Sequence, residues 1–368
     1  MRGRRVAVGS AVVVAALLAA GTTVAVTRGS DGNRHPAAGA GDEASASTPA
    51  PGTTSSTSTG SATSSTTSTT LAANRDVTVR HAVGTAVEVY VDRTRLTSPN
   101  GDFPGAPERT LVTEIWYPAQ GDPGPDPGAS SLPGAAPDRS RGPYPVVVFA
   151  HGFGVTPDFY AALLSRWAAA GFVVVAPTYP ILSGTPGGAS HVDYVQTFFD
   201  TSFVITQVEA ATRRPGNLLA GLADPGRLAV AGHSDGEVIA WAVGFLECCR
   251  DPRVDAVLAM AGDLANANNP FVGHADLPVL HVMDTEDAYD PYPHSIAWDR
   301  ENLPSPRWIL TLLGASHAPP FANPRDPWFP VVLDATVAFL DGTLVQPDQL
   351  DAIGGIVASA RGRAALER

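Results

Sequence analysis

Apolar runs alternate with amphipathic stretches from residue 144 onward. Residues 144–150 ("YPVVVFA") form a continuous apolar run, which is typical of a parallel strand covered on both faces. The pattern then predicts helices over 158–171, 194–211, 237–248 and 328–340, and strands over 172–180, 227–232, 254–262, 277–283 and 307–314. Strands that alternate with helices imply right-handed crossovers. We therefore expect an α/β fold, a mostly parallel doubly wound sheet with helices on both faces.

The chain before this alternation divides into three parts. Strands are predicted at 85–92 and 110–118, followed by a Pro/Gly-rich surface loop over 121–143, so the folded domain is expected to span 75–368. Residues 30–74 are rich in Ser, Thr and Pro and carry too little apolar surface to offset the entropy of ordering. They are expected to form a disordered linker.

Residues 1–29 have the pattern of an export segment. Arg2, Arg4 and Arg5 precede an uncharged apolar stretch, 6–26, which as a helix would be about 31 Å long and could cross a bilayer. Small residues at 19–21 offer a cleavage site, so a cleaved signal peptide and an uncleaved membrane anchor both stay open. Basic residues before the stretch predict that the folded domain lies outside the cytoplasm, secreted or membrane-anchored.

The stretch "GRLAVAGHSDGEVIAW" (226–241) places Ser234 between a buried strand and a helix. A serine in such a strand–turn–helix context is typical of a nucleophile elbow, in which a strained turn exposes the hydroxyl. Gly232 and Gly236 lack side chains, which lets strand and helix approach each other. The helix N-terminus also favours negative charge that develops beside the serine. Ser234 is therefore the candidate nucleophile.

A serine hydroxyl needs a base and an orienting acid, because it is a poor nucleophile by itself. In this type of fold they follow the serine in the order acid, then histidine, at the ends of later strands. The strand over 277–283 is followed by four acidic residues, Asp284, Glu286, Asp287 and Asp290, and the strand over 307–314 is followed by His317. An oxyanion hole would use the N–H of Asp235 and, from "HGFG" (151–154), the N–H of Phe153.

Five motifs together resemble the α/β-hydrolase superfamily. "EIWYPA", "VVVFAHGFG", "VAGHSDG", "PVLHVMDTEDAYDPY" and "GASHAPPF" are similar in order and spacing to serine esterases of the group that holds platelet-activating-factor acetylhydrolases, dienelactone-hydrolase-like enzymes and cutinase-type polyester hydrolases. The resemblance covers 114–368 and implies cleavage of carboxylic esters through an acyl-enzyme, with Ser234, Asp287 and His317 as the triad. In that group the acid lies four residues before a proline, here Pro291, which favours Asp287; Asp284 is second and Asp263 third.

The substrate is less closely defined. The gap between the strands that end at 262 and begin at 277 is too short for a crossover helix and a lid, so we expect no large cap domain. Loops at 154–159, 181–199 and 288–294 would then form the walls, with Phe153, Tyr179 and Tyr289 as candidate contacts, although core packing is the alternative for each.

Three departures from the polyester hydrolases bear on the substrate. They usually carry methionine at Asp235, tryptophan near Gly262 and glycine at Glu237. The first two departures place a carboxylate near the acyl site and remove an aromatic wall, which argues against polyesters and long-chain lipids. A small or polar ester, or an amide, fits as well as a lipid-like ester. A non-catalytic hydrolase-like surface protein is the alternative function.

Composition excludes several other classes of function. A net charge of −12 and a pI near 5.1 argue against a nucleic-acid partner. The acidic residues over 284–290 lack calcium-loop spacing, so neither metal nor cofactor is expected. Cys248 and Cys249 are adjacent, and a regular helix cannot accommodate a disulfide ring between neighbours. We expect them to be unbridged, half-buried side chains near a helix end. The oligomeric state is left open.

Overall fold

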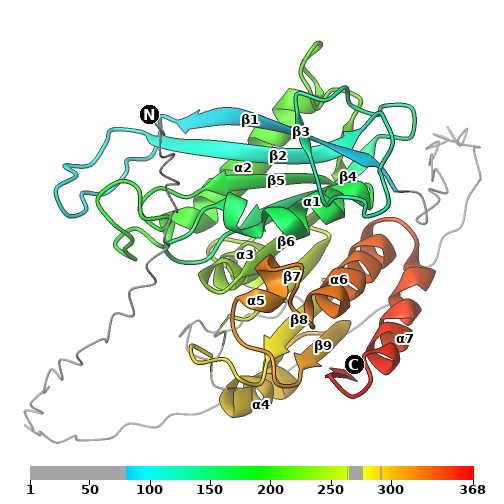
Figure 1. Ribbon diagram of the computed structural model, residues 1–368. Helices are drawn as coiled ribbons and strands as arrows, with labels where there is room; N and C mark the ends of the chain where they lie inside the picture. Colours follow the sequence, from blue (N-terminus) through cyan, green and yellow to red (C-terminus); the bar gives the residue numbers. More distant parts are fainter. Residues whose placement is uncertain (1–79, 263, 265–276, 291) are drawn as a thin grey trace, which may run out of the picture. The chain divides into compact units, whose positions relative to one another are not determined.

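A ten-stranded sheet forms the centre of the fold (Figure 1). The computed structural model describes residues 80–262, 264, 277–290 and 292–368, which belong to one compact unit, Thr70–Arg368. The strand order is β10-β9-β8-β7-β6-β4-β5-β2-β1-β3. The strands are β1 (Ala82–Asp92), β2 (Arg109–Ala119), β3 (Leu132–Pro133), β4 (Tyr144–Ala150), β5 (Val173–Thr178), β6 (Ala223–His233), β7 (Ala256–Met260), β8 (Val279–Asp284), β9 (Arg307–Leu312) and β10 (Ala364–Glu367).

The strands from β5 to β9 pair in parallel through β4, β6, β7 and β8, as the alternating pattern predicts. Antiparallel pairing is confined to the flanks, where β2 joins β5, β1 joins β2 and β10 joins β9. The prediction of a mostly parallel doubly wound sheet is confirmed. Because β6, β8 and β9 run in one direction, the residues that follow them emerge at the same edge of the sheet.

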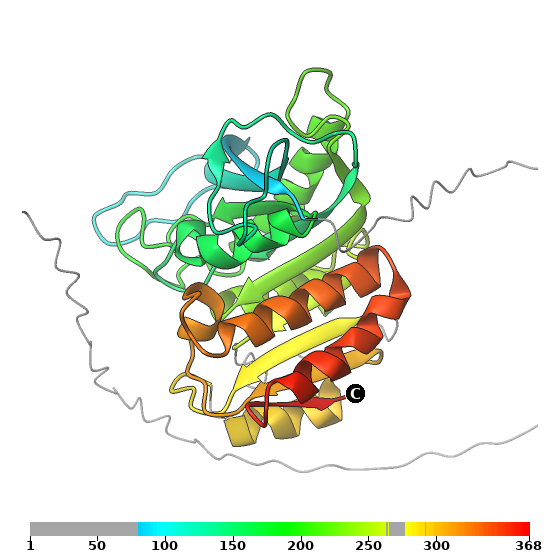
Figure 2. The ribbon, with the colours of Figure 1, turned by 45° about the vertical axis from the view of Figure 1, so that its right-hand side comes forward.

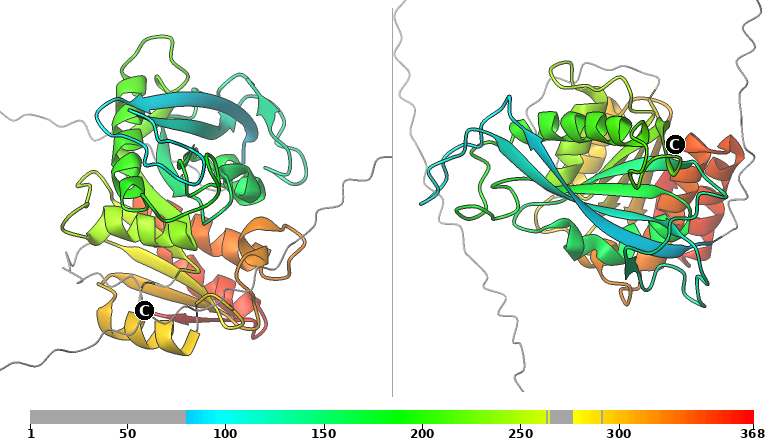
Figure 3. Two further views of the ribbon diagram at one scale, coloured as in Figure 1. Left: turned by 90° about the vertical axis from the view of Figure 1, so that its left-hand side faces the viewer. Right: turned by 90° about the horizontal axis from the view of Figure 1, so that it is seen from above.

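Helices cover both faces of the sheet (Figures 2 and 3). They are α1 (Ala161–Ala169), α2 (Gln196–Thr212), α3 (Asp235–Phe245), α4 (Tyr292–Asn302), α5 (Pro319–Ala322), α6 (Phe329–Leu344) and α7 (Ala352–Ser359), with short 3-10 helices η1 (Pro157–Tyr160) and η2 (Pro347–Asp351). Buried residues of α2, α3 and α4 share one apolar cluster, and those of α1, α6 and α7 share the other. Strand β4 contributes to both: Val148 faces the first cluster and Val147 the second, as the two-residue period of a strand requires.

The structure departs from the predicted elements in several places. Helix α3 begins at Asp235 and ends at Phe245, so it covers 235–245 rather than 237–248. Helix α4 and strand β10 were not predicted, because their short sequences mix polar and apolar residues without a clear period. The first turn of α4 therefore takes residues 292–294, which were expected in a loop wall.

The two cysteines correct a further expectation. Cys248 and Cys249 form a disulfide, although they were expected to be unbridged. The physical reason for the error is position: helix α3 ends at Phe245, so the pair lies beyond the helix whose regular geometry would have excluded the bond.

Some expectations fall on parts of the chain that the structure does not describe. The export segment 1–29, the linker 30–74, Asp263 and most of the gap expected to lack a lid lie outside the described residues. Within the described ranges, no helix has the length and apolar character needed to cross a membrane.

Candidate active site

Ser234 alone forms the turn between strand β6 and helix α3. Its backbone has φ 59° and ψ −127°, a conformation that is rare for a residue with a side chain and costs about 1–3 kcal/mol. A Cβ atom on Gly232 would lie 1.8 Å from the carbonyl oxygen of Gly236, and one on Gly236 would lie 2.1 Å from that of Ala150. The two glycines are therefore a steric requirement of the turn that presents the Ser234 hydroxyl.

Ser234, His317 and Asp287 are joined by two hydrogen bonds. Ser234 Oγ lies 2.9 Å from His317 Nε2, and His317 Nδ1 lies 2.6 Å from Asp287 Oδ2. Asp287 accepts a further bond on Oδ1 from the N–H of Tyr289, at 2.8 Å. Burial raises the pKa of Asp287, but these hydrogen bonds outweigh it and hold the pKa below its ordinary value. An ionised Asp287 fixes the Nδ1–H tautomer of His317 and leaves Nε2 free to accept the serine proton.

Asp284, the second candidate acid, has a different environment. Its side chain is 2% exposed, and neither carboxylate oxygen has a hydrogen-bond partner among the described residues. Burial, followed by repulsion from Asp287, raises the pKa of Asp284 to about 9. Asp284 is therefore neutral at pH 7, and the structure brings Asp287 rather than Asp284 to His317.

The loop after β4 is held so that one backbone donor stays available. The Gly152 N–H donates to Tyr160 Oη at 3.3 Å, and the Gly154 N–H donates to the Leu182 carbonyl at 2.8 Å. Neither the Phe153 N–H nor the Asp235 N–H donates a hydrogen bond to any residue in the described part of the chain. The Asp235 N–H belongs to the first helical residue of α3, where such donors have no acceptor within the helix.

Two buried histidines hold backbone segments of the site: His151 binds the loop after β4, and His233 binds the segment that carries His317. Burial lowers the pKa of His151 to about 4, so the ring is neutral; its Nδ1–H donates to the Gly152 carbonyl at 2.8 Å. Its Nε2 accepts from the Tyr179 N–H at 2.9 Å. Burial likewise lowers the pKa of His233 to about 3, and its Nε2–H donates to the His317 carbonyl at 2.8 Å. Sequence reasoning assigned no role to either ring.

The three candidate substrate contacts differ in exposure. Phe153 is 44% exposed and Tyr289 is 76% exposed, with the Tyr289 ring 4.8 Å from that of His317. Tyr179 is fully buried, and its hydroxyl is hydrogen bonded to Thr201 at 2.7 Å. Tyr179 directly follows β5, and its ring packs into the core. It is therefore a packing residue beneath the loop and does not form a wall of an open site.

Sequence reasoning missed His191, which contacts both residues predicted to supply the oxyanion donors. Its ring stacks on Phe153 with centroids 4.6 Å apart, and its Nε2 lies 2.5 Å from Asp235 Oδ2. His191 lies in a Gly- and Pro-rich segment without hydrophobic periodicity, so no sequence signal pointed to it.

Glu237, singled out as a departure, lies beneath the elbow rather than beside the substrate. It is fully buried and lies 3.0 Å from His281 Nε2, while His281 Nδ1 lies 2.6 Å from Asp299. Its second oxygen accepts from the Gly262 N–H at 2.7 Å. Burial raises the pKa of Glu237 to about 7, although His281 opposes the shift. This acidic side chain therefore joins α3 to β8 and α4.

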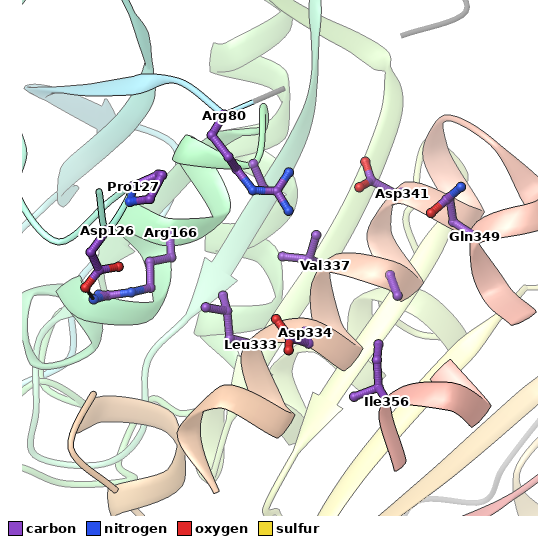
Figure 4. Close-up of a pocket in the computed structure, with 12 residues that line it drawn as sticks. Arg80, Asp126, Pro127, Arg166, Leu333, Asp334, Val337, Asp341, Gln349 and Ile356 are labelled. Atoms are coloured by element: carbon purple, nitrogen blue, oxygen red, sulfur yellow. Dashed lines mark hydrogen bonds and ion pairs between the residues drawn. The ribbon is translucent and has the colours of Figure 1, made fainter. Parts of the chain in front are cut away.

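A cavity of about 500 Å³ lies between α1, α6 and α7 and contains none of the predicted site residues (Figure 4). Basic Arg80 and Arg166 and acidic Asp126, Asp334 and Asp341 line it together with apolar side chains. Within the described ranges, no group of three or more histidine, cysteine or acidic residues could hold a metal ion.

Comparison with known proteins agrees with this architecture. The family model described as Chlorophyllase matches residues 126–261, which include the loop after β4 and the elbow but end before Asp287 and His317. No curated protein matches the chain. Among solved structures, a ferulic acid esterase from Streptomyces cinnamoneus is 23% identical, with a TM-score of 0.55 over 73% of this chain and 91% of that one. The chain therefore has an α/β-hydrolase fold, and the two similarities support a carboxylic-ester hydrolase.

Proposed function

We propose that the protein is an exported serine esterase that cleaves carboxylic esters through an acyl-enzyme. One observation carries the proposal: Ser234, His317 and Asp287 are hydrogen bonded in series, at 2.9 and 2.6 Å, and the backbone of Ser234 is held in a strained turn. The Arg-flanked apolar stretch 6–26 supports export, either as a cleaved signal or as a membrane anchor.

The proposed reaction has two halves. Ser234 Oγ attacks the ester carbonyl carbon while His317 Nε2 takes the serine proton, and the N–H groups of Phe153 and Asp235 stabilise the oxyanion. Collapse of this intermediate expels the alcohol, which receives the proton from His317. Water then attacks the acyl-enzyme with His317 as base, and the carboxylic acid leaves. Asp287 stabilises the imidazolium in both halves without taking a proton.

We further propose a small-molecule or lipid-like ester with an apolar or aromatic group. The exposed rings of Phe153 and Tyr289 support this choice, because aromatic side chains beside a hydroxyl nucleophile offer stacking surface. The pairing of Asp235 with His191 at 2.5 Å also supports an apolar group, because the carboxylate already has a hydrogen-bond partner when the substrate displaces water. The ferulic acid esterase is a structural neighbour at 23% identity, which is compatible with an aromatic ester.

A fluorophosphonate probe tests the chemistry directly. The wild type should be labelled on Ser234 and should hydrolyse p-nitrophenyl esters, and Ser234→Ala should lose both properties. A series of p-nitrophenyl esters of increasing acyl length, extended with an aromatic acyl ester, would then define the substrate. Absence of labelling in the wild type, or labelling that survives Ser234→Ala, would favour the non-catalytic surface protein instead.

A further inference from the structure

The segment 181–195, which connects β5 to α2, contacts both proposed oxyanion donors. The Leu182 carbonyl accepts from the N–H of Gly154, the residue after Phe153. Farther along the segment, the Tyr194 hydroxyl donates to the Asp235 carbonyl at 2.6 Å. The segment therefore bridges the loop after β4 and the first residue of α3, which are far apart in the sequence.

His191 makes the central contact of this bridge. Its ring stacks on Phe153 at an interplanar angle of 26°, and its Nε2–H donates to the Asp235 carboxylate at 2.5 Å. Tyr194 packs edge-on against the same ring, with centroids 5.3 Å apart. The side chain of Asp235 is 27% exposed and that of His191 is 56% exposed, so the pair lies at the surface of the site.

Buried ion pairs anchor the segment on the sheet. Asp193, two residues after His191, lies 2.6 Å from Arg109 Nη1, and both side chains are almost fully buried. Arg109 also binds Asp200 through two bonds, at 2.8 and 2.6 Å. At the other side, Asn100 donates to the carbonyl oxygens of residues 186 and 188. The position of His191 is therefore imposed by the fold rather than by its own surface contacts.

The charge of Asp235 explains why such a contact matters. A carboxylate on the residue whose N–H would bind the oxyanion disfavours the developing negative charge, and this repulsion is strong where water is displaced. A histidine that donates to this carboxylate offsets the repulsion. The same ring, stacked on Phe153, restrains the second donor.

We propose that His191 is a positioning residue of the oxyanion hole, which holds the Phe153 and Asp235 segments in register and offsets the charge of the Asp235 carboxylate. The inference rests on the proposed esterase function and adds a residue to it. It predicts that the loss caused by removing His191 depends on whether residue 235 carries a charge.

Three variants test the inference: His191→Ala, Asp235→Asn and the double variant. For p-nitrophenyl acetate, we expect His191→Ala to lower kcat about 10- to 100-fold with little change in KM, and to slow fluorophosphonate labelling similarly. Asp235→Asn removes the charge but keeps an amide oxygen that can accept from His191, so its kcat should fall less than that of His191→Ala. The double variant should regain much of the kcat lost in His191→Ala. Arg300→Gln, which breaks an exposed ion pair with Glu367, is the matched control and should not change kcat.

The outcomes separate the inference from the function. If the wild type is labelled on Ser234 and His191→Ala keeps wild-type kcat, the inference is wrong and the esterase stands. A double variant no faster than His191→Ala would overturn the charge argument, and a loss confined to KM would overturn the positioning role. If His191→Ala does not fold, a large loss of kcat in a folded Asp235→Asn would contradict the inference. An unlabelled wild type overturns the proposed function and, with it, the inference.

Discussion

The phenolic oxygen of Tyr160 lies 2.9 Å from Nδ1 of His233. Because His233 donates through Nε2 to the His317 carbonyl, its Nδ1 must accept, so Tyr160 donates. Tyr160 in turn accepts the N–H of Gly152. One buried hydroxyl therefore connects the loop that would hold the oxyanion to the backbone of the histidine that would act as base.

Tyr160→Phe should impair turnover more than its loss of stability explains. It leaves Gly152 N–H and His233 Nδ1 unpaired in a buried site, at a cost of about 1–3 kcal/mol. If about 1.4 kcal/mol of this cost raises the free energy of the transition state above that of the bound substrate, kcat falls about tenfold. Steady-state kinetics and thermal melts measure the two effects. Tyr117→Phe, which loses one hydroxyl bond to Ala135 at the flank of the sheet, should keep its kcat; an equal loss there would contradict the argument.

Asp287→Asn should lower kcat far more than Asp284→Asn. Asparagine at 287 can stabilise the wrong tautomer of His317 and cannot stabilise an imidazolium, so kcat should fall about 10³- to 10⁴-fold. Asp284 is neutral and buried, so its amide replacement should leave kcat within about threefold of wild type. Kinetics on one p-nitrophenyl ester compare the two variants directly. The reverse order would transfer the role of the acid to Asp284.

The thermal stability of the folded domain should fall as pH rises from about 7 to about 9, above the range in which His151 and His233 lose their protons in the unfolded chain. Asp284, Glu237 and His281 each have a raised pKa, about 9 for Asp284 and about 7 for Glu237. Each therefore keeps its proton in the folded state at pH values where the unfolded chain has released it. Protons bound preferentially by the folded state stabilise it at low pH, and this stabilisation is lost as pH rises through the raised pKa.

Asp284→Asn supplies the control for this pH dependence. The substitution removes one of the three groups, so it should raise the melting temperature relative to the wild type more at about pH 8.5 than at about pH 5.5. Each kcal/mol of added stability corresponds to about 2–4 °C. Differential scanning calorimetry across this range measures the slope. A wild-type stability that rises toward pH 9 would contradict the burial of these three protonated groups.

Gly232→Ala should abolish folding, because its Cβ would lie 1.8 Å from a carbonyl oxygen of α3. Such a contact cannot be relieved without separating β6 from α3. Gly355→Ala is the matched control: it lies in α7, where a Cβ meets nothing within 4 Å. There we expect a gain of about 0.4–1 kcal/mol from the reduced entropy of the unfolded chain. Yield of soluble protein and melting temperature distinguish the two variants, and a stable Gly232→Ala would disprove the close approach.

The sequence predicted those features that depend on local pattern. The apolar run 144–150, the glycines around Ser234 and the place of His317 after a strand follow from periodicity, sterics and chain direction. The choice of Asp287 among four acidic residues rested on the resemblance to α/β-hydrolases. His191 and Asp299 could not be predicted, because their partners depend on how a loop and a helix fold back over the sheet. Both roles were open for Tyr179, because a residue that follows a strand can turn its ring toward the core or toward the site; the structure turns it toward the core.

The strained turn at Ser234 implies a trade-off between activity and robustness. Its φ of 59° is held by the surrounding structure, and glycine adopts such values without the side-chain clash. Ser234→Gly would therefore yield an inactive protein that resists heat better than the wild type, whereas Ser234→Ala would not share that gain. For the proposed nucleophile, selection for catalysis opposes selection for durability, and a chain that had lost its enzymatic role would be free to relax this turn.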